Sequence, residues 1–458
     1  MFESSRFLDS ARQELRAERA ATARRLIALG HYATDRMAEL GNSRQDWVVD
    51  DWELVAVEVG TDLGIGRHRA STEMVHGQTL IERLPRLAEV FLAGDLDYGH
   101  FTAIASRTAL ITDPDLLAIV DERVAARVPG WSARSRDKVA ELVDWLVREI
   151  DPDAIRVAKR RRAQRHIGIG PAGDGMAEIY GIVDAEDGAV VDKRLDELAA
   201  TVCRDDPRPH AARRSDAMRA MADGATKLAC LCGSADCPAG AAEAPAGTIV
   251  IHVLAEQATL DGDCETPGLL PGYGAIPAEQ VREMAPRAKC RPLPLPQELI
   301  SESVYRPSVR LADFVRARDL TCRWYGCNAP AERCDIDHTT PWPDGPTHPT
   351  NNKLYCRTHH LVKTFCPDWV DTQAADGRVI LISPSGRIYT TKPDGALFFP
   401  QLAAPTGELA PTQAPPPTAA RGTAMPTRTR RRARDRAYRI AHERALNRAR
   451  AEANPPPF

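Results

Sequence analysis

Apolar residues in the first 150 positions recur at intervals of three and four, which is the spacing of one face of an α-helix. Ala, Leu, Arg and Glu, all good helix formers, dominate the same region. The first clear stripe consists of Leu26, Leu29, Ala33, Met37 and Leu40. A second stripe consists of Leu80, Leu84, Leu87 and Phe91. The pattern predicts a mostly helical N-terminal region whose stripes form its core.

Alternation of apolar and other residues, which is typical of β-strands, occurs in two later regions. Residues 166–170 and 176–183 alternate on either side of Gly173-Asp174-Gly175, which predicts a β-hairpin near residues 166–183. Residues 378–382 and 387–389 predict two more strands around a turn at residues 383–386. We therefore expect an α+β protein.

The chain has 458 residues, which is enough for two or three domains. Its net charge is only −3, so any contact with nucleic acid must come from local basic patches. The first residues are polar and lack an apolar signal core, and no run of about 18 apolar residues occurs. We expect a cytoplasmic protein with reduced thiols and no association with membranes.

Metal-ligating residues are concentrated between residues 319 and 364. Cys322 and Cys327 are separated by four residues, and Cys356 and His359 by two. Two short pairs of this kind are the layout of a structural zinc site, because each tight turn presents two ligands to a tetrahedral ion. The alternative is a set of unrelated thiols in a reduced protein.

The same stretch carries a second pattern around the zinc ligands. It consists of Asp337-His338, then Asn351, then Cys356-Arg-Thr-His359-His360-Leu-Val-Lys363. This pattern resembles the HNH nuclease domain, a small zinc-stapled module of the ββα-metal type. The resemblance implies such a module at residues 301–395, with zinc as its structural staple.

The HNH resemblance also implies roles for individual residues. His338 would be the general base, and Asp337 and His360 would hold one catalytic Mg²⁺ or Mn²⁺ ion. Asn351 would either bind that metal or fix the loop that aims the base. His360 and Asn351 thus count with His338 as catalytic candidates, and Lys363 as a residue that contacts nucleic acid. A histidine suits the base because its neutral ring accepts a proton near neutral pH.

The N-terminal region extends the resemblance. Together with residues 272–279 and the run Tyr305-Arg-Pro-Ser308, its helical pattern is similar to the actinobacterial 13E12-repeat proteins. Those proteins join an N-terminal domain of unknown function to an HNH module. The resemblance implies that residues 1–300 form the domain of unknown function.

The C-terminal residues differ in composition from the rest. Residues 396–426 are rich in Pro and Ala and predict a linker, and residues 427–458 form an Arg-rich tail. We expect this basic tail to be disordered alone and helical when bound. Its Arg430, Arg431 and Arg432 are candidates for contact with nucleic-acid phosphates. The alternative is a solvated tail.

Three more cysteines, Cys230, Cys232 and Cys237, lie within eight residues. They are either part of a second zinc site or a loop of free thiols. Cys203, Cys264 or a histidine would supply the fourth ligand of such a site.

The sequence thus leads to two functional hypotheses. The first is a divalent-metal-dependent HNH endonuclease that hydrolyses DNA phosphodiester bonds. The second is a non-catalytic, zinc-containing DNA-binding protein derived from such a nuclease. Both expect DNA as the partner and no small-molecule substrate, and nothing in the sequence indicates the oligomeric state.

Overall fold

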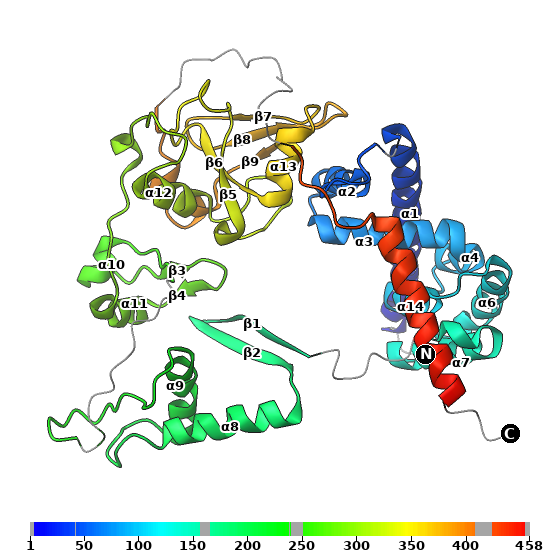
Figure 1. The fold of residues 1–458 in the computed structure, drawn as a ribbon, viewed down its shortest axis with the longest axis horizontal. Helices are drawn as coiled ribbons and strands as arrows, with labels where there is room; N and C mark the ends of the chain where they lie inside the picture. Colours follow the sequence, from blue (N-terminus) through cyan, green and yellow to red (C-terminus); the bar gives the residue numbers. More distant parts are fainter. Residues whose placement is uncertain are drawn as a thin grey trace. The chain divides into compact units, whose positions relative to one another are not determined.

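The computed structural model describes residues 4–41, 43–155, 165–237, 239, 251–407 and 424–453. The chain forms two compact units (Figure 1). Unit 1 comprises residues 1–157 together with 291–458, and unit 2 comprises residues 158–290. Helices and several small sheets make up both, as expected of an α+β protein. This division differs from the domain boundary that the sequence led us to expect at residue 300, because the N-terminal helices share unit 1 with the C-terminal module.

The N-terminal half of unit 1 is helical, as predicted. Its elements are α1 (Ser5–Leu40), α2 (Asp51–Leu63), α3 (Arg67–Gln78), the π-helical η1 (Thr79–Arg83), α4 (Pro85–Leu92), α5 (Tyr98–Thr108), α6 (Pro114–Arg127) and α7 (Arg136–Ile150). The predicted second stripe is fully buried in their common core. Helices α1 and α3 approach closely at Gly30 and Gly77, where a Cβ on Gly77 would lie 2.1 Å from the Leu26 carbonyl oxygen.

The C-terminal half of unit 1 holds the Cys- and His-rich stretch. Its elements are α12 (Val309–Asp319), β5 (Cys334–His338), β6 (Asn352–Cys356), α13 (Arg357–Phe365), β7 (Val370–Gln373), β8 (Val379–Ile382) and β9 (Ile388–Thr391). Strands β5 and β6 pair antiparallel, and β7, β8 and β9 form a separate antiparallel sheet (Figure 1). An aromatic core around Trp324, Tyr355 and Trp369 also takes in Val57 of α2.

The prediction of a disordered basic tail is wrong for residues 432–453, which form helix α14 (Arg432–Ala453). Carboxylates of the N-terminal helices and their connections pair with three of its arginines, Arg432, Arg444 and Arg448. Arg432 pairs with Asp50 and Glu53, and Arg444 pairs with Asp151. Composition indicated few apolar anchors, but ion pairs to distant acids are not visible in the composition of the tail.

The expected linker at residues 396–426 is partly ordered. Short 3₁₀ turns at Asp394–Leu397 and Pro400–Ala403 bury Phe399 and Leu402. Residues 408–423 lie outside the described residues.

Unit 2 is built from small elements. They are β1 (His166–Gly173), β2 (Met176–Ile182), α8 (Ala185–Ala199), α9 (His210–Ala222), α10 (Gln257–Asp261), β3 (Gly268–Leu270), β4 (Gly274–Ile276) and α11 (Ala278–Met284). The predicted hairpin is confirmed, with β1 and β2 antiparallel around Gly173, Asp174 and Gly175, all at positive φ. None of the described helices in either unit combines the length and apolarity needed to cross a lipid bilayer.

Candidate active site

A ββα arrangement positions the candidate residues. Strand β5 ends at His338, a loop leads to β6, and β6 runs directly into α13. Asp337 lies opposite Lys353 in the strand register. The buried guanidinium of Arg318 donates to the carbonyls of Pro349 (2.7 Å) and Asn352 (2.8 Å), which fixes the end of the loop.

Cys322, Cys327, Cys356 and His359 form one group, the Cys322 cluster, whose ligand atoms all lie within 4.8 Å of one another. His359 Nδ1 lies 3.4 Å from Cys322 Sγ and 3.2 Å from Cys356 Sγ. The ring of Trp324 stacks on the His359 ring at 4.7 Å. The structure thus brings together all four predicted zinc ligands, and the cluster could hold a metal ion such as zinc.

The donor chemistry of the Cys322 cluster fits a cation. Burial raises the pKa of the Cys322 thiol well above its usual value. A buried thiolate therefore needs a positive partner, and three sulfurs with one imidazole are a set that zinc accepts. Cys334, though close in sequence, lies outside the four residues whose ligand atoms all come within 4.8 Å of one another, and its sulfur contacts the carbonyls of Ala329 and Pro330.

Asp337 and His360, the predicted catalytic-metal pair, meet directly. Asp337 Oδ1 lies 3.4 Å from His360 Nε2. The other ring nitrogen of His360, Nδ1, lies 2.9 Å from Asp335 Oδ2. A carboxylate on one nitrogen of a histidine orients the ring and leaves the second nitrogen for a cation. Sequence reasoning missed Asp335, although it lies two residues before Asp337 and hence on the same face of β5.

Two lysines surround the other oxygen of Asp337. Lys363 Nζ lies 2.7 Å from Asp337 Oδ2 and also donates to the carbonyl of His338. Lys353, with 0% of its side chain exposed, lies 2.9 Å from Asp371 and 3.5 Å from Asp337. Burial raises the pKa of Asp337, but Lys363, Lys353 and His360 outweigh it and leave the pKa lowered. Lys363, predicted to contact nucleic acid, is therefore engaged inside the site.

His338 lies at the end of β5 with a defined hydrogen bond. Its Nε2 lies 2.8 Å from the hydroxyl of Thr347, which itself donates to the carbonyl of Val304. Because the hydroxyl proton is used, Nε2 carries the ring proton and Nδ1 is left as an acceptor. Tyr305 stacks on the ring at 5.4 Å. Burial lowers the pKa of His338, which favours the neutral ring.

The side chain of Asn351 holds the loop between β5 and β6. Its Oδ1 accepts from the Thr340 amide at 2.8 Å, and its Nδ2 donates to the carbonyls of Thr340 (3.0 Å) and Pro346 (2.9 Å). A Cβ on Gly345 would lie 2.7 Å from Asn351 Nδ2. Of the two expected roles, these contacts favour fixing the loop after the histidine.

Comparison with known proteins places the chain in a family. The sequence model described as "Domain of unknown function (DUF222)" matches residues 13–319. The chain belongs to the DUF222 family. The match ends at Asp319, so the Cys322 cluster and Asp337 lie beyond the residues that define a DUF222 domain here.

Mycobacterial proteins resemble this DUF222 chain over nearly its whole length. "Uncharacterized protein Rv2100" of Mycobacterium tuberculosis is 41% identical, with 96% of this chain and 88% of the relative covered. "Uncharacterized protein Rv3776" of the same organism is 40% identical, with 94% and 88% covered. No solved structure matches the DUF222 chain.

The arginines predicted to bind nucleic acid lie in the C-terminal part of the DUF222 chain, on and just before α14. Arg431 pairs with Asp46 at 2.7 Å, and Arg432 with Asp50 at 3.0 Å. The guanidinium of Arg430 lies 4.8 Å from the ring centre of Tyr438. The structure thus assigns all three to contacts within the chain, where a DNA phosphate would compete with carboxylates for Arg431 and Arg432.

Proposed function

We propose that this protein is a divalent-metal-dependent endonuclease that hydrolyses DNA phosphodiester bonds. The observation that carries the proposal is the meeting of Asp337 Oδ1 and His360 Nε2 at 3.4 Å, one residue away from His338. The ββα arrangement and the Cys322 cluster support it, because they hold these three side chains on one small rigid module. In this proposal the Cys322 cluster holds structural zinc, and the module is of the HNH type.

The charges around Asp337 and His360 bear on whether a cation fits there. Three carboxylates, those of Asp335, Asp337 and Asp371, face two ammonium groups, those of Lys353 and Lys363. The guanidinium of Arg357 lies 3.4 Å from Asp335 as a third cationic group, so the charges sum to zero and support for a cation comes from the atoms that face each other. Asp337 Oδ2 is held by the lysines, whereas Oδ1 faces His360, so a carboxylate oxygen and an imidazole nitrogen fit a divalent ion. A bound Mg²⁺ or Mn²⁺ ion would supply charge stabilisation at the scissile phosphate.

The residues of the chain perform the remaining steps. His338 Nδ1 accepts the proton of the attacking water, while Thr347 holds the ring through Nε2. Asp335 orients His360, and Asn351 fixes the loop that follows the base. General-base catalysis of this kind typically contributes about 10²–10⁴ in rate.

A nicking assay tests the proposal. Full-length protein is incubated with supercoiled plasmid in the presence of Mg²⁺, Mn²⁺ or EDTA. We expect metal-dependent nicking that falls by about 10²-fold or more in His338→Ala. His31→Ala, on the exposed face of α1, is the control and should nick normally. Full activity in His338→Ala would refute the assigned base.

A specific observation favours the second candidate function, a non-catalytic DNA-binding protein. Lys363 and Lys353 already neutralise much of the negative charge of Asp337, as expected of a module that no longer binds a catalytic cation. This alternative predicts DNA binding that weakens with salt and no nicking with either metal.

A further inference from the structure

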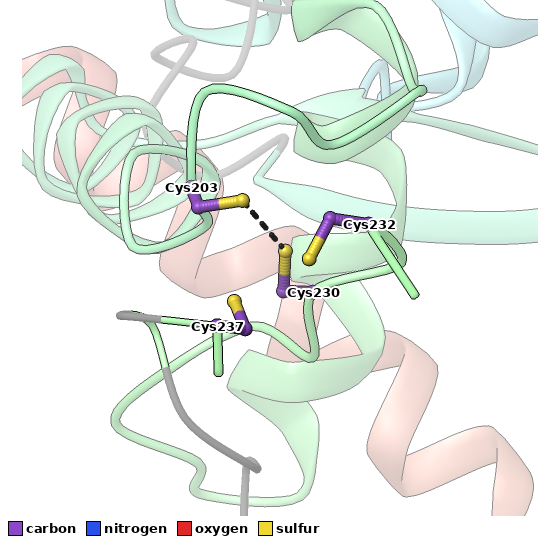
Figure 2. Close-up of side chains that lie close together, drawn as sticks. All are labelled: Cys203, Cys230, Cys232 and Cys237. Atoms are coloured by element: carbon purple, nitrogen blue, oxygen red, sulfur yellow. Dashed lines mark hydrogen bonds between the residues drawn. The ribbon is translucent and has the colours of Figure 1, made fainter. Parts of the chain in front are cut away.

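A second group of metal-ligating residues lies in unit 2, far along the chain from the candidate active site. Cys203 follows α8, whereas Cys230, Cys232 and Cys237 follow α9. The four sulfurs, here called the Cys203 cluster, all lie within 4.8 Å of one another. Figure 2 shows the four side chains converging. The sulfurs of Cys203 and Cys230 are 3.5 Å apart.

The packing around the Cys203 cluster is thin. The buried apolar residues of the α8–α9 region are only Leu198, Ala199, Ala217 and Leu228. Larger apolar side chains in the same region, such as Val190 and Leu231, are exposed. These four residues are two alanines and two leucines. Hydrophobic burial alone therefore contributes little to the stability of the cysteine loops.

Hydrogen bonds fix the loop that carries Cys203 relative to the loop that carries Cys230. The carboxylate of Asp206 accepts from Arg208 at 2.8 Å and from the Leu231 amide at 2.9 Å. The hydroxyl of Thr201 accepts from the Leu228 amide at 2.8 Å. These bonds join the loop of Cys203 to the loop of Cys230, so they place thiols that are 27 residues apart. Outer contacts of this kind orient the ligands of a metal site.

We propose that the Cys203 cluster binds one zinc ion as a closed structural site. Four thiolates complete a tetrahedral shell and leave no open position, which is the arrangement of structural rather than catalytic zinc. The sequence left the fourth ligand open among Cys203, Cys264 and a histidine. The structure selects Cys203, since Cys264 Sγ lies against the hydroxyls of Thr259 and Thr266.

The zinc ion would stabilise this region in place of a hydrophobic core. It ties the connection after α8 to the connection after α9, and its binding energy becomes folding energy for both. The inference does not rest on nuclease activity, because the Cys203 cluster belongs to unit 2 and the proposed nuclease site to unit 1.

Metal content of the full-length protein tests the proposal. We expect two zinc ions per chain by mass spectrometry of the metals, one for each cluster. Cys230→Ser and Cys356→Ser should each lose one ion, and the double variant should lose both. Cys290→Ser is the matched control, because Cys290 is exposed and belongs to neither cluster, and it should keep both ions.

Further outcomes decide between the alternatives. Cys230→His retains a zinc-ligating group and should restore the second ion, which separates a lost ligand from a general failure to fold. Two ions in Cys230→Ser would overturn the proposal. So would a wild-type protein with one zinc ion that Cys356→Ser removes. A Cys203–Cys230 disulfide in freshly alkylated protein, or iron in place of the second zinc, would overturn it as well.

Discussion

The two cysteine clusters differ in what surrounds them. The Cys322 cluster adjoins an aromatic core in which Trp324, Tyr355 and Trp369 pack against one another. The Cys203 cluster adjoins a few small aliphatic residues and a set of hydrogen bonds. Under our proposals, a zinc ion would reinforce an existing core at the Cys322 cluster and would take the place of a core at the Cys203 cluster.

Metal removal should have the largest effect and should separate the two regions most clearly. Structural zinc contributes about 10–16 kcal/mol of folding energy in small zinc-dependent peptides. On treatment with a zinc chelator we expect α8, α9 and their connections to lose nearly all protection in hydrogen–deuterium exchange. The β6–α13 segment should keep partial protection, because its aromatic core remains. Equal loss in both regions would remove the contrast.

The Trp324→Ala substitution removes a side chain of the aromatic core and leaves the four residues of the Cys322 cluster unchanged. Trp324 is 1% exposed, stacks on the His359 ring, and donates to the Thr61 hydroxyl at 2.8 Å. We expect the free energy of unfolding to fall by about 3–5 kcal/mol in urea titrations of unit 1 signals. Trp145→Ala, at a position 65% exposed, is the control and should change it by about 0.5 kcal/mol or less. Equal effects of the two changes would contradict the role given to the aromatic core.

Asp206→Asn weakens the polar frame of the Cys203 cluster without touching a ligand. The change removes the charge that Arg208 pairs with, at a buried position. We expect zinc affinity of this cluster to drop by about 10-fold to 100-fold, as for other outer contacts of metal ligands. Competition with a chromogenic zinc chelator measures this affinity. Asp236→Asn, near the cluster in sequence, serves as the control and should bind zinc normally.

The sequence predicted elements better than it predicted partners. The stripe that includes Leu80 and Phe91 predicted buried helices because a helical repeat reports which face is apolar. The Asp-His, Asn and Cys-x-x-His pattern located the candidate site because its residues are close in sequence. Comparison confirmed a domain of unknown function in the N-terminal region, and the 13E12-repeat and HNH assignments stay predictions.

The missed features all depend on contacts between distant residues. Lys353 pairs with Asp371, a partner that the sequence gives no reason to assign to it. Cys203 was one of several possible fourth ligands until the fold placed it 3.5 Å from Cys230. The acids that order the tail, such as Asp50 and Asp151, lie hundreds of residues before it.

Helix α14 extends the comparison to a region held almost without burial or metal. It has no buried residue, and among its apolar side chains Ile440 packs, partly buried, against the helical core. Arg444 donates to the carboxylate of Asp151 at 2.7 Å and to the Leu110 carbonyl at 2.9 Å. Because Asp151 is buried, Arg444→Ala leaves its charge without this partner.

We expect Arg444→Ala to have the smallest effect on global stability, about 1 kcal/mol, because Arg444 remains partly exposed. Its local effect should be larger, with faster hydrogen–deuterium exchange throughout α14 and more so at high salt, which screens the remaining pairs. Arg439→Ala is the control, since Arg439 pairs with Asp435 within the same helix and does not dock it. If α14 exchanges equally fast in both variants, ion pairs to the N-terminal helices are not what orders the tail, and its arginines remain available to DNA phosphates.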